Sequence, residues 1–175
     1  MKNVFIPKVL ILFVLFGFSL CKSYSKTNID SLWIVWQDSS QHDSIRFTAM
    51  RSLIWDVCLN ASQDSANYFT QMGFDFAKGK ANKKEMAFTL YMETRNHYKN
   101  NAYVQAIESA KNLLVICEQI DYKTGCSSSL VLMGMSHFNM GDFSKALNCY
   151  LESIKINELI GDQEELSKSL NNAGH

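Results

Sequence analysis

The sequence is almost without proline, because Pro7 is the only one among its 175 residues. Proline is the residue that most strongly interrupts a helix, so nothing after Pro7 forces a helix to end. Lys and Arg number 17, as do Asp and Glu, and no long run of one charge occurs. The sequence therefore lacks the basic footprint of a nucleic-acid-binding protein. Its hydrophobic fraction of 47% is ordinary and is enough for one domain with a core.

The sequence also lacks the short motifs that carry catalysis, cofactors or metals. It contains no glycine-rich phosphate loop of the GxGxxG or Walker type, and no nucleophile elbow. Without a C-x-x-C pair, a zinc or redox motif is not supported either. We therefore expect no catalytic residue, no cofactor and no metal in the residues of this chain.

The cysteines beyond the first 25 residues allow two interpretations. They are Cys58, Cys117, Cys126 and Cys149. Cys117 and Cys126 flank one expected turn between helices, so a disulfide between them fits the geometry of an exported chain. The alternative, which we prefer for most of the four, is a buried free thiol that acts as a small apolar filler.

Two histidines recur at the same place in the pattern. His97 and His137 stand forty residues apart. They are either two ligands of one metal or packing residues between helices. We expect packing, because no acidic residue nearby has the spacing of a metal ligand.

The chain does contain a repeat, and its clearest copy is Ser127–Gly161. This stretch predicts two amphipathic helices joined by a Gly-Asp turn. The small residues Gly134 and Ala146 stand where two helices must touch. The large residue Tyr150 stands where a hole between them must be filled.

The chain matches itself at a period of forty residues. The pairs that coincide are Phe143 with Tyr103, Ala146 with Ala106, Leu147 with Ile107, Ile156 with Ile116, Ile160 with Ile120, His137 with His97, and Phe138 with Tyr98. Shifted the other way, Leu130 falls on Leu170 and Gly134 falls on Gly174. A period that holds in both directions indicates a repeat array.

The spacing of the clearest copy resembles the tetratricopeptide repeat, whose signature is W-x2-L-G-x2-Y, then A-x3-F, then P. Its slots hold Leu130, Met133-Gly134, His137, Ala146, Tyr150 and Glu158, so the first Trp, the Tyr and the Pro are substituted. The resemblance implies an all-α fold, an antiparallel helix-hairpin solenoid wound as a right-handed superhelix. The repeat would have forty residues in place of about 34. This repeat is a binding scaffold with many uses, so the resemblance implies no particular chemistry.

The period divides the chain into six segments. They are a signal peptide at 1–25, a lead-in with a short capping helix at 26–43, a divergent hairpin at 44–86, repeats at 87–126 and 127–166, and the start of a truncated repeat at 167–175. A repeat array normally closes with a polar-faced helix, so the truncated repeat predicts a fragment of a longer protein. We expect the last segment to fray and to leave Ile154 and Leu159 uncovered.

The first segment has the make-up of an export signal. Lys2 and Lys8 give it a positive start, and Val9–Leu20 is an apolar run without charge. Ser23-Tyr24-Ser25 offers small residues for cleavage before Lys26. The apolar run is shorter than the ~20 residues that comfortably span a bilayer, which favours a cleaved signal over an uncleaved anchor.

A lipoprotein signal at Cys21 is the third interpretation. We disfavour it, because Leu20 stands where such signals usually have Gly, Ala or Ser. All three interpretations predict an exported chain. We expect it to be periplasmic, or anchored in the membrane and facing the periplasm.

The lead-in carries a tryptophan pair. Asp30-Ser31 predicts the start of a short helix, in which Trp33 and Trp36 share one face at a spacing of three. The pair either covers the open end of the first hairpin or binds a ligand. We prefer the cover, because the terminal units of repeat arrays need one.

In tetratricopeptide arrays the first helix of each hairpin lines the concave groove, and the resemblance carries this role to three stretches. They contribute Thr48, Arg51, Trp55, Cys58 and Leu59; then Phe88, Tyr91, Arg95, Tyr98 and Lys99; then Ser128, Val131, Met135, Phe138 and Asn139. Aromatic side chains with interspersed Arg and Lys are typical of interface hot spots. The alternative is that these side chains pack against neighbouring helices. We expect a protein or peptide partner and no nucleic acid.

A second resemblance covers the whole chain. Asp30–Asp38, Asp43–Arg46, Gly161-Asp162 and Ser169–Gly174 are similar to the exported N-terminal region of bacterial membrane adenylate/guanylate cyclases and sensor histidine kinases. In those proteins the repeat array precedes a membrane span and a cytoplasmic output domain. The resemblance implies a sensory or interaction region of a larger signalling protein. The alternative is the N-terminal portion of such a cyclase or kinase, with its catalytic domain outside this chain.

Overall fold

The computed structural model of the chain describes residues 26–60 and 62–174, without the side chains of residues 26–28, 59 and 60. The predicted signal peptide therefore lies outside the described residues. Those residues form eight helices: α2 (Lys26–Gln37), α3 (Asp43–Asn60), α4 (Gln63–Gly79), α5 (Lys83–Lys99), α6 (Tyr103–Gln119), α7 (Lys123–Asn139), α8 (Phe143–Ile160) and α9 (Gln163–Ala173). No strand occurs in this part of the chain. The prediction of an all-α fold is confirmed.

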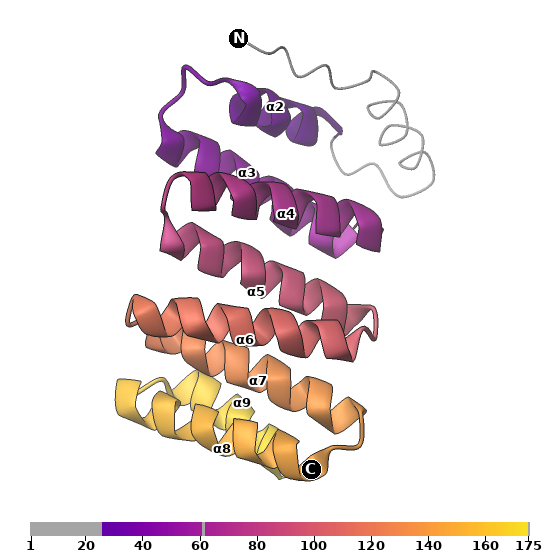
Figure 1. Cartoon of the computed structure of the whole chain (residues 1–175), viewed down its shortest axis with the longest axis vertical. Helices are drawn as coiled ribbons and strands as arrows, with labels where there is room; N and C mark the ends of the chain where they lie inside the picture. Colours follow the sequence, from indigo (N-terminus) through magenta and orange to yellow (C-terminus); the bar gives the residue numbers. More distant parts are fainter. Residues whose placement is uncertain (1–25, 61, 175) are drawn as a thin grey trace.

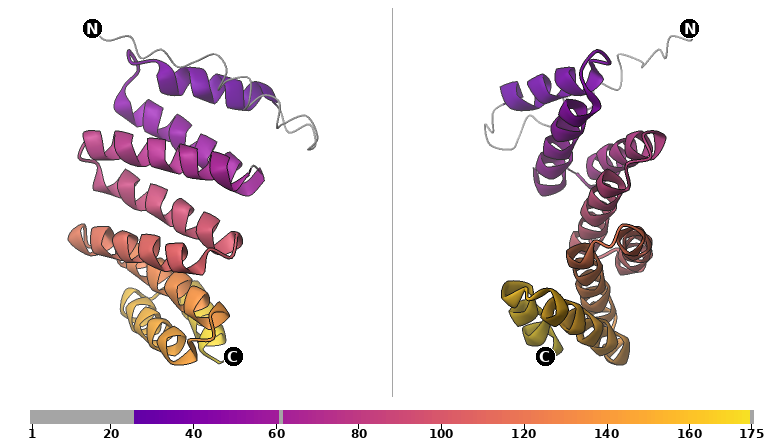
Figure 2. Two further views of the ribbon diagram at one scale, coloured as in Figure 1. Left: turned by 45° about the vertical axis from the view of Figure 1, so that its right-hand side comes forward. Right: turned by 90° about the vertical axis from the view of Figure 1, so that its left-hand side faces the viewer.

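Each helix packs against the next one in the sequence, so the helices form a row along the long axis of the molecule (Figure 1). The row begins with α2 and ends with α8 and α9, and Figure 2 shows that it is curved and twisted. In addition, α3 contacts α5 and α5 contacts α7. We call these three helices the α3–α5–α7 layer; α4, α6 and α8 alternate with them.

The turns between the helices repeat with a fixed spacing. From α3 onward the helices begin at residues 43, 63, 83, 103, 123, 143 and 163. Five turns have one residue with positive φ at the same place, namely Ala81, Asn101, Asp121, Gly141 and Gly161. In each turn the residue after it donates its N–H to a carbonyl five residues earlier, as in Asp142 N to His137 O at 2.9 Å. This is the Schellman ending of a helix.

Ala81 is the one residue in these five turns that a left-handed backbone suits poorly, with φ of 52°. A residue other than glycine lowers the stability of the folded chain by roughly 1–2 kcal/mol in this left-handed conformation, and glycine avoids that cost. Glycine has an opposing effect, because its greater freedom stabilises the unfolded chain by ~0.4–1 kcal/mol. We expect Ala81→Gly to raise the free energy of unfolding by up to about 1 kcal/mol. Urea unfolding measures this change, and Gly141→Ala is the matched control that should lower stability. A loss of stability in Ala81→Gly would contradict the turn geometry.

The lead-in helix covers the first hairpin as expected. Trp36 is buried and meets Phe76 of α4 edge-on, with ring centroids 4.6 Å apart. Trp33 meets Phe69 in the same way at 5.7 Å. The expected start of this helix at Asp30-Ser31 is wrong, because α2 begins at Lys26 and Asp30 lies inside it.

The clearest copy of the repeat packs through its small residues. Gly134 of α7 faces the ring of Tyr150 on α8, and a Cβ atom at Gly134 would lie 2.5 Å from Tyr150 Cε1. Ala146 is 1% exposed on the same helix as Tyr150. The sequence assigned these three residues to the contact between the helices, and they are buried there.

We expect Ala146→Leu to lower the free energy of unfolding by ~1–3 kcal/mol, because extra methylene groups in a packed contact force their neighbours apart. Thermal melting measures the loss. Lys145→Leu is a control on the exposed side of α8 and should change stability much less. Equal melting temperatures for Ala146→Leu and the parent chain would contradict the packing described above.

The end of the row differs in part from the expectation. Residues 163–173 form α9, which packs on α8. Ile154 is buried, so the expectation that it lies uncovered is wrong; it falls one helical turn after the buried Tyr150 and shares its face. Leu159 is 75% exposed, as expected. Among the helices described, none is both long and apolar enough to cross a membrane.

Candidate functional site

The residues predicted to form a binding surface lie on α3, α5 and α7, and α5 contacts both of the other two helices. Exposed members are Thr48, Arg51, Trp55, Lys99, Phe138 and Asn139; partly buried members are Phe88, Tyr91, Arg95, Tyr98, Ser128, Val131 and Met135. The prediction is wrong for Cys58, which is buried in the first core cluster. The side chain of Leu59 lies outside the described residues.

Arg51 joins α3 to α5 by two contacts. Its guanidinium carbon lies 4.3 Å from the ring centroid of Phe88, which is a cation–π distance. Its Nη1 lies 3.3 Å from Glu85 Oε1. The resemblance implied Arg51 and Phe88 but not Glu85, whose role depends on how α3 and α5 cross.

Arg95 lies between two aromatic rings. Its guanidinium carbon is 5.6 Å from the ring centroid of Trp55 on α3 and 5.6 Å from that of Tyr91, one turn earlier on α5. Trp55 remains 44% exposed beside it. The three side chains therefore form a partly open platform of two rings and one cation.

A pocket of about 500 Å³ opens beside this platform. Its lining includes Arg51, Trp55 and Phe88, and adds three residues that the sequence did not suggest: Leu32, Ser52 and Asp56. Ser52 and Asp56 each follow a predicted residue on α3. Leu32 comes from α2, and no periodic pattern could place it, because its position depends on how α2 docks.

Polar contacts hold the α5 and α7 parts of the surface together. Asn139 Nδ2 donates to Tyr98 Oη at 3.1 Å and to the carbonyl oxygen of Met135 at 2.8 Å. Phe138 packs edge-on against Phe143, with ring centroids 5.4 Å apart. Tyr98, Phe138 and Asn139 thus have contacts within the chain, although Phe138 remains exposed.

Charge is distributed unevenly between the two sets of helices. The α3–α5–α7 layer carries seven Lys or Arg residues and four Asp or Glu residues. Helices α4, α6 and α8 carry four Lys or Arg residues and six Asp or Glu residues. The layer that presents the aromatic residues is therefore net positive, and the alternating set is net negative.

A scan against protein-family models finds no match for this chain, and a search of curated proteins finds none. The residues of the α3–α5–α7 layer are therefore the basis for the function proposed below.

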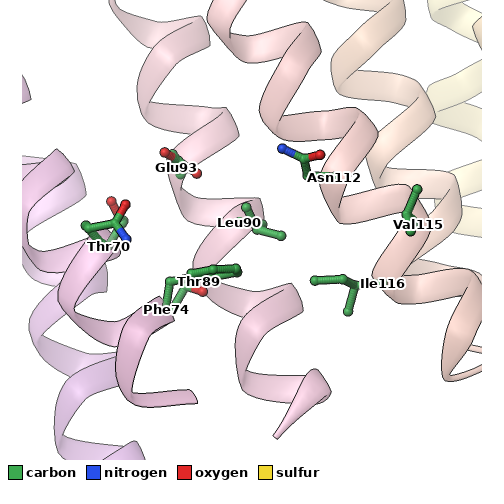
Figure 3. A pocket seen from close by; sticks show the side chains of 9 residues that line it. Thr70, Phe74, Thr89, Leu90, Glu93, Asn112, Val115 and Ile116 are labelled. Carbon is green, nitrogen blue, oxygen red and sulfur yellow. The ribbon is translucent and has the colours of Figure 1, made fainter. Parts of the chain in front are cut away.

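A second pocket, of about 410 Å³, lies between α4, α5 and α6 (Figure 3). Its walls are largely apolar, with Phe74, Leu90, Val115 and Ile116 facing the space. The hydroxyl of Thr70 is bound to its own helix, donating to Ala66 O at 2.9 Å. No sequence pattern predicts this pocket, because residues of three different helices line it.

The two recurring histidines lie partly buried at the ends of their helices. His97 Nε2 lies 3.7 Å from Glu93 Oε1, and His137 Nδ1 lies 3.4 Å from Asp142 Oδ2. No cluster of three or more His, Cys, Asp or Glu side chains suited to a metal ion occurs in the described part of the chain. The geometry thus gives each histidine one acidic neighbour.

All four described cysteines are free thiols, and three of them are buried. Burial raises the pKa of Cys117 to about 12 and that of Cys58 to about 11. An elevated pKa keeps the thiol protonated and unreactive at neutral pH. These residues therefore act as apolar fillers, the interpretation preferred from the sequence.

The raised pKa of Cys117 predicts a loss of stability in base. The thiol's ordinary pKa is 9.0 and its folded pKa is about 12, so the folded chain keeps the proton longer. This contribution is fully present below pH 9 and disappears as the pH rises towards about 12. We expect the free energy of unfolding of the parent chain to fall more steeply over this range than that of Cys117→Ala, measured by urea unfolding. Parallel curves would contradict the assignment.

Proposed function

We propose that the chain is a protein- or peptide-binding scaffold and that the α3–α5–α7 layer is its binding surface. The observation that carries the proposal is the platform of Trp55, Arg95 and Tyr91, a partly exposed Trp and Tyr around a cation. Trp, Tyr and Arg are the residues in which interface binding energy concentrates.

We further propose that the architecture is a tetratricopeptide-like solenoid with a repeat of forty residues. Three features support this proposal: the spacing of the helix starts, the recurrent positive-φ residue, and the Gly134–Tyr150 contact. The contacts of α3 with α5 and of α5 with α7 fit the inner layer of such an array. The proposed surface would then be its concave groove.

We place this scaffold outside the cytoplasm, as the sensory or interaction region of a larger signalling protein. The proposal depends on the signal-like residues 1–25 and on the resemblance to exported regions of cyclases and histidine kinases. The N-terminus of the chain expressed in a bacterium should lie at or near Lys26. An intact Met1 on soluble cytoplasmic protein would refute export.

The binding function is tested by selecting random twelve-residue peptides on the purified chain and measuring the affinity of those enriched. Trp55→Ala removes an exposed ring from the layer, and we expect at least tenfold weaker binding. Tyr68→Ala is the matched control, because Tyr68 on α4 is 46% exposed and lies outside the layer. Equal losses in both variants, or no enriched peptide, would overturn the proposal.

A further inference from the structure

Arg95 differs from the other two arginines because no carboxylate of the described side chains pairs with its charge. The chain has three arginines, Arg46, Arg51 and Arg95. Arg46 lies 3.9 Å from Asp43, and Arg51 lies 3.3 Å from Glu85. Arg95 has no carboxylate within ion-pair distance among the side chains that the structure describes.

The two rings around Arg95 prepare it to bind an anion. A guanidinium presents five N–H donors in a planar fork that matches the two oxygens of a carboxylate. Here the rings of Trp55 and Tyr91 lie next to the guanidinium group of Arg95. The centroid of each ring is 5.6 Å from the guanidinium carbon. Ordering the side chain in advance lowers the entropy that a ligand must overcome.

Groups of both signs lie near Arg95: Asp56 in the pocket beside Trp55 and Glu93 on α5 are acidic, whereas the basic groups lie towards α7 and the end of α3. Lys99, one turn further along α5, donates to the carbonyl oxygen of Cys58 at 3.4 Å, so its ammonium group lies at the same junction of α3 and α5. The charges of Arg95 and Lys99 both act to lower the pKa of the nearby Cys58 thiol, although burial outweighs them. On the far side, α7 has one lysine and no acidic residue.

We propose that the partner is an acidic peptide segment and that Arg95 receives one of its carboxylates. The proposal rests on the binding function proposed above and names the chemistry of the ligand. The pocket beside Trp55 takes a side chain of the peptide that has an apolar part for Leu32 and Phe88, because Arg51, Ser52 and Asp56 make the rest of its lining polar. A nucleic acid needs a row of basic side chains for successive phosphates, and Arg95 offers a single fork suited to one carboxylate.

The test uses two labelled twelve-residue peptides and the purified chain. One consists of Glu and Asp with two Phe, and its twin has Gln and Asn in place of the acids. We expect the acidic peptide to bind at least tenfold more tightly by fluorescence anisotropy, and its affinity to fall as salt is added. Equal affinities for the two peptides would overturn the proposal.

Variants at Arg95 then locate the carboxylate. Arg95→Gln should abolish the preference for the acidic peptide, and Arg95→Lys should restore only part of it, because lysine keeps the charge and loses the fork. Lys111→Gln on α6 removes the same charge from an exposed position outside the layer and should leave the preference unchanged. Melting temperatures of all variants show whether a loss of binding reflects a loss of folding.

The remaining outcomes separate this proposal from the one on which it rests. Selected peptides that need Trp55 but have no acidic bias would overturn the role of Arg95 and leave the binding surface in place. An Arg95→Gln variant that folds and keeps the full preference would do the same. A single-stranded DNA of equal charge that binds as tightly as the acidic peptide would show general attraction to polyanions and would also overturn the proposal.

Discussion

Replacing Tyr150 by alanine is expected to lower the free energy of unfolding by about 3–5 kcal/mol, the usual cost of truncating a large buried aromatic side chain. Tyr150 is 4% exposed, and its ring fills the space that the missing side chain of Gly134 leaves on α7. Truncation would leave a cavity between α7 and α8 that a rigid pair of helices closes only in part. Urea unfolding followed by circular dichroism measures the loss.

Two companions of this variant test the cause. Tyr150→Phe keeps the ring and should cost far less than the alanine variant. In the Tyr150→Ala background, Gly134→Leu places a new side chain in the vacated space and should recover part of the loss. In the parent chain the same Gly134→Leu should destabilise, because its Cβ would lie 2.5 Å from the ring. A loss for Gly134→Leu in both backgrounds would contradict the fit of ring and glycine.

Replacing Trp36 by alanine is expected to cost a similar amount, about 3–5 kcal/mol, and to release α2 from the first hairpin. Trp36 is 7% exposed, and its ring packs edge-on against Phe76. Its main-chain carbonyl oxygen accepts a hydrogen bond from Arg46 Nε at 3.0 Å. Among the α2 side chains that the structure describes, Trp36 is the one that is buried in the core; four other apolar ones pack against the core only partly buried. Hydrogen exchange should show the amides of α2 losing protection before those of α5.

Trp55→Ala is the matched control, since Trp55 is exposed on α3. It should cost much less stability and leave α2 protected. Unchanged protection of α2 in Trp36→Ala would mean that the tryptophan is not what holds this helix. Equal losses in the two tryptophan variants would contradict the burial that distinguishes them.

The helical fold and the pairing of α7 with α8 were accessible from the sequence, because their cause is local. Gly134, Ala146 and Tyr150 combine the smallest residues with a large one at helical spacing, and few other arrangements satisfy that combination. The turn at Gly141 was accessible for the same reason, since glycine suits a positive φ.

Other elements depend on tertiary packing that local preference does not reveal. The turn after α4 uses Ala81 for its positive φ, although Gly79 stands two residues earlier. Propensity favours the glycine, but the packing of α4 against α5 decides where the helix ends. For the same reason α5 and α7 begin at Lys83 and Lys123, four residues before the repeat starts chosen at 87 and 127.

Buried polar residues escape hydrophobic periodicity. Ser127, Ser153 and Ser169 lie in a row across α7, α8 and α9, with their hydroxyl oxygens 3.0 and 2.8 Å apart. Asn157 donates to Ser169 at 3.2 Å in the same row. Because serine and asparagine usually face solvent, a sequence pattern assigns these positions to the surface. Hydrogen bonds offset the cost of burying the three serines and join the last three helices, whereas Asn157 Oδ1 has no hydrogen-bond partner among the described residues.

The candidate surface was predictable as a set of positions and not as a set of contacts. The resemblance to the tetratricopeptide repeat implies that Trp55, Tyr91 and Arg95 share one layer. It says nothing of the crossing of α3 and α5, and that crossing brings the guanidinium between the two rings. The same limit hid Leu32 and Asp56, which line the adjoining pocket.

The constant spacing of the left-handed residues has a consequence for how such a chain can change its length. Residues 81, 101, 121, 141 and 161 occupy equivalent places in successive turns. Removing the forty residues 82–121 would place Tyr122 directly after Ala81 and join α4 to α7 through a turn of the same shape. Every later helix would keep its face towards its neighbour. Recombination between equivalent turns can therefore shorten or extend the row by whole hairpins, and adjust the reach of its surface without designing a new junction.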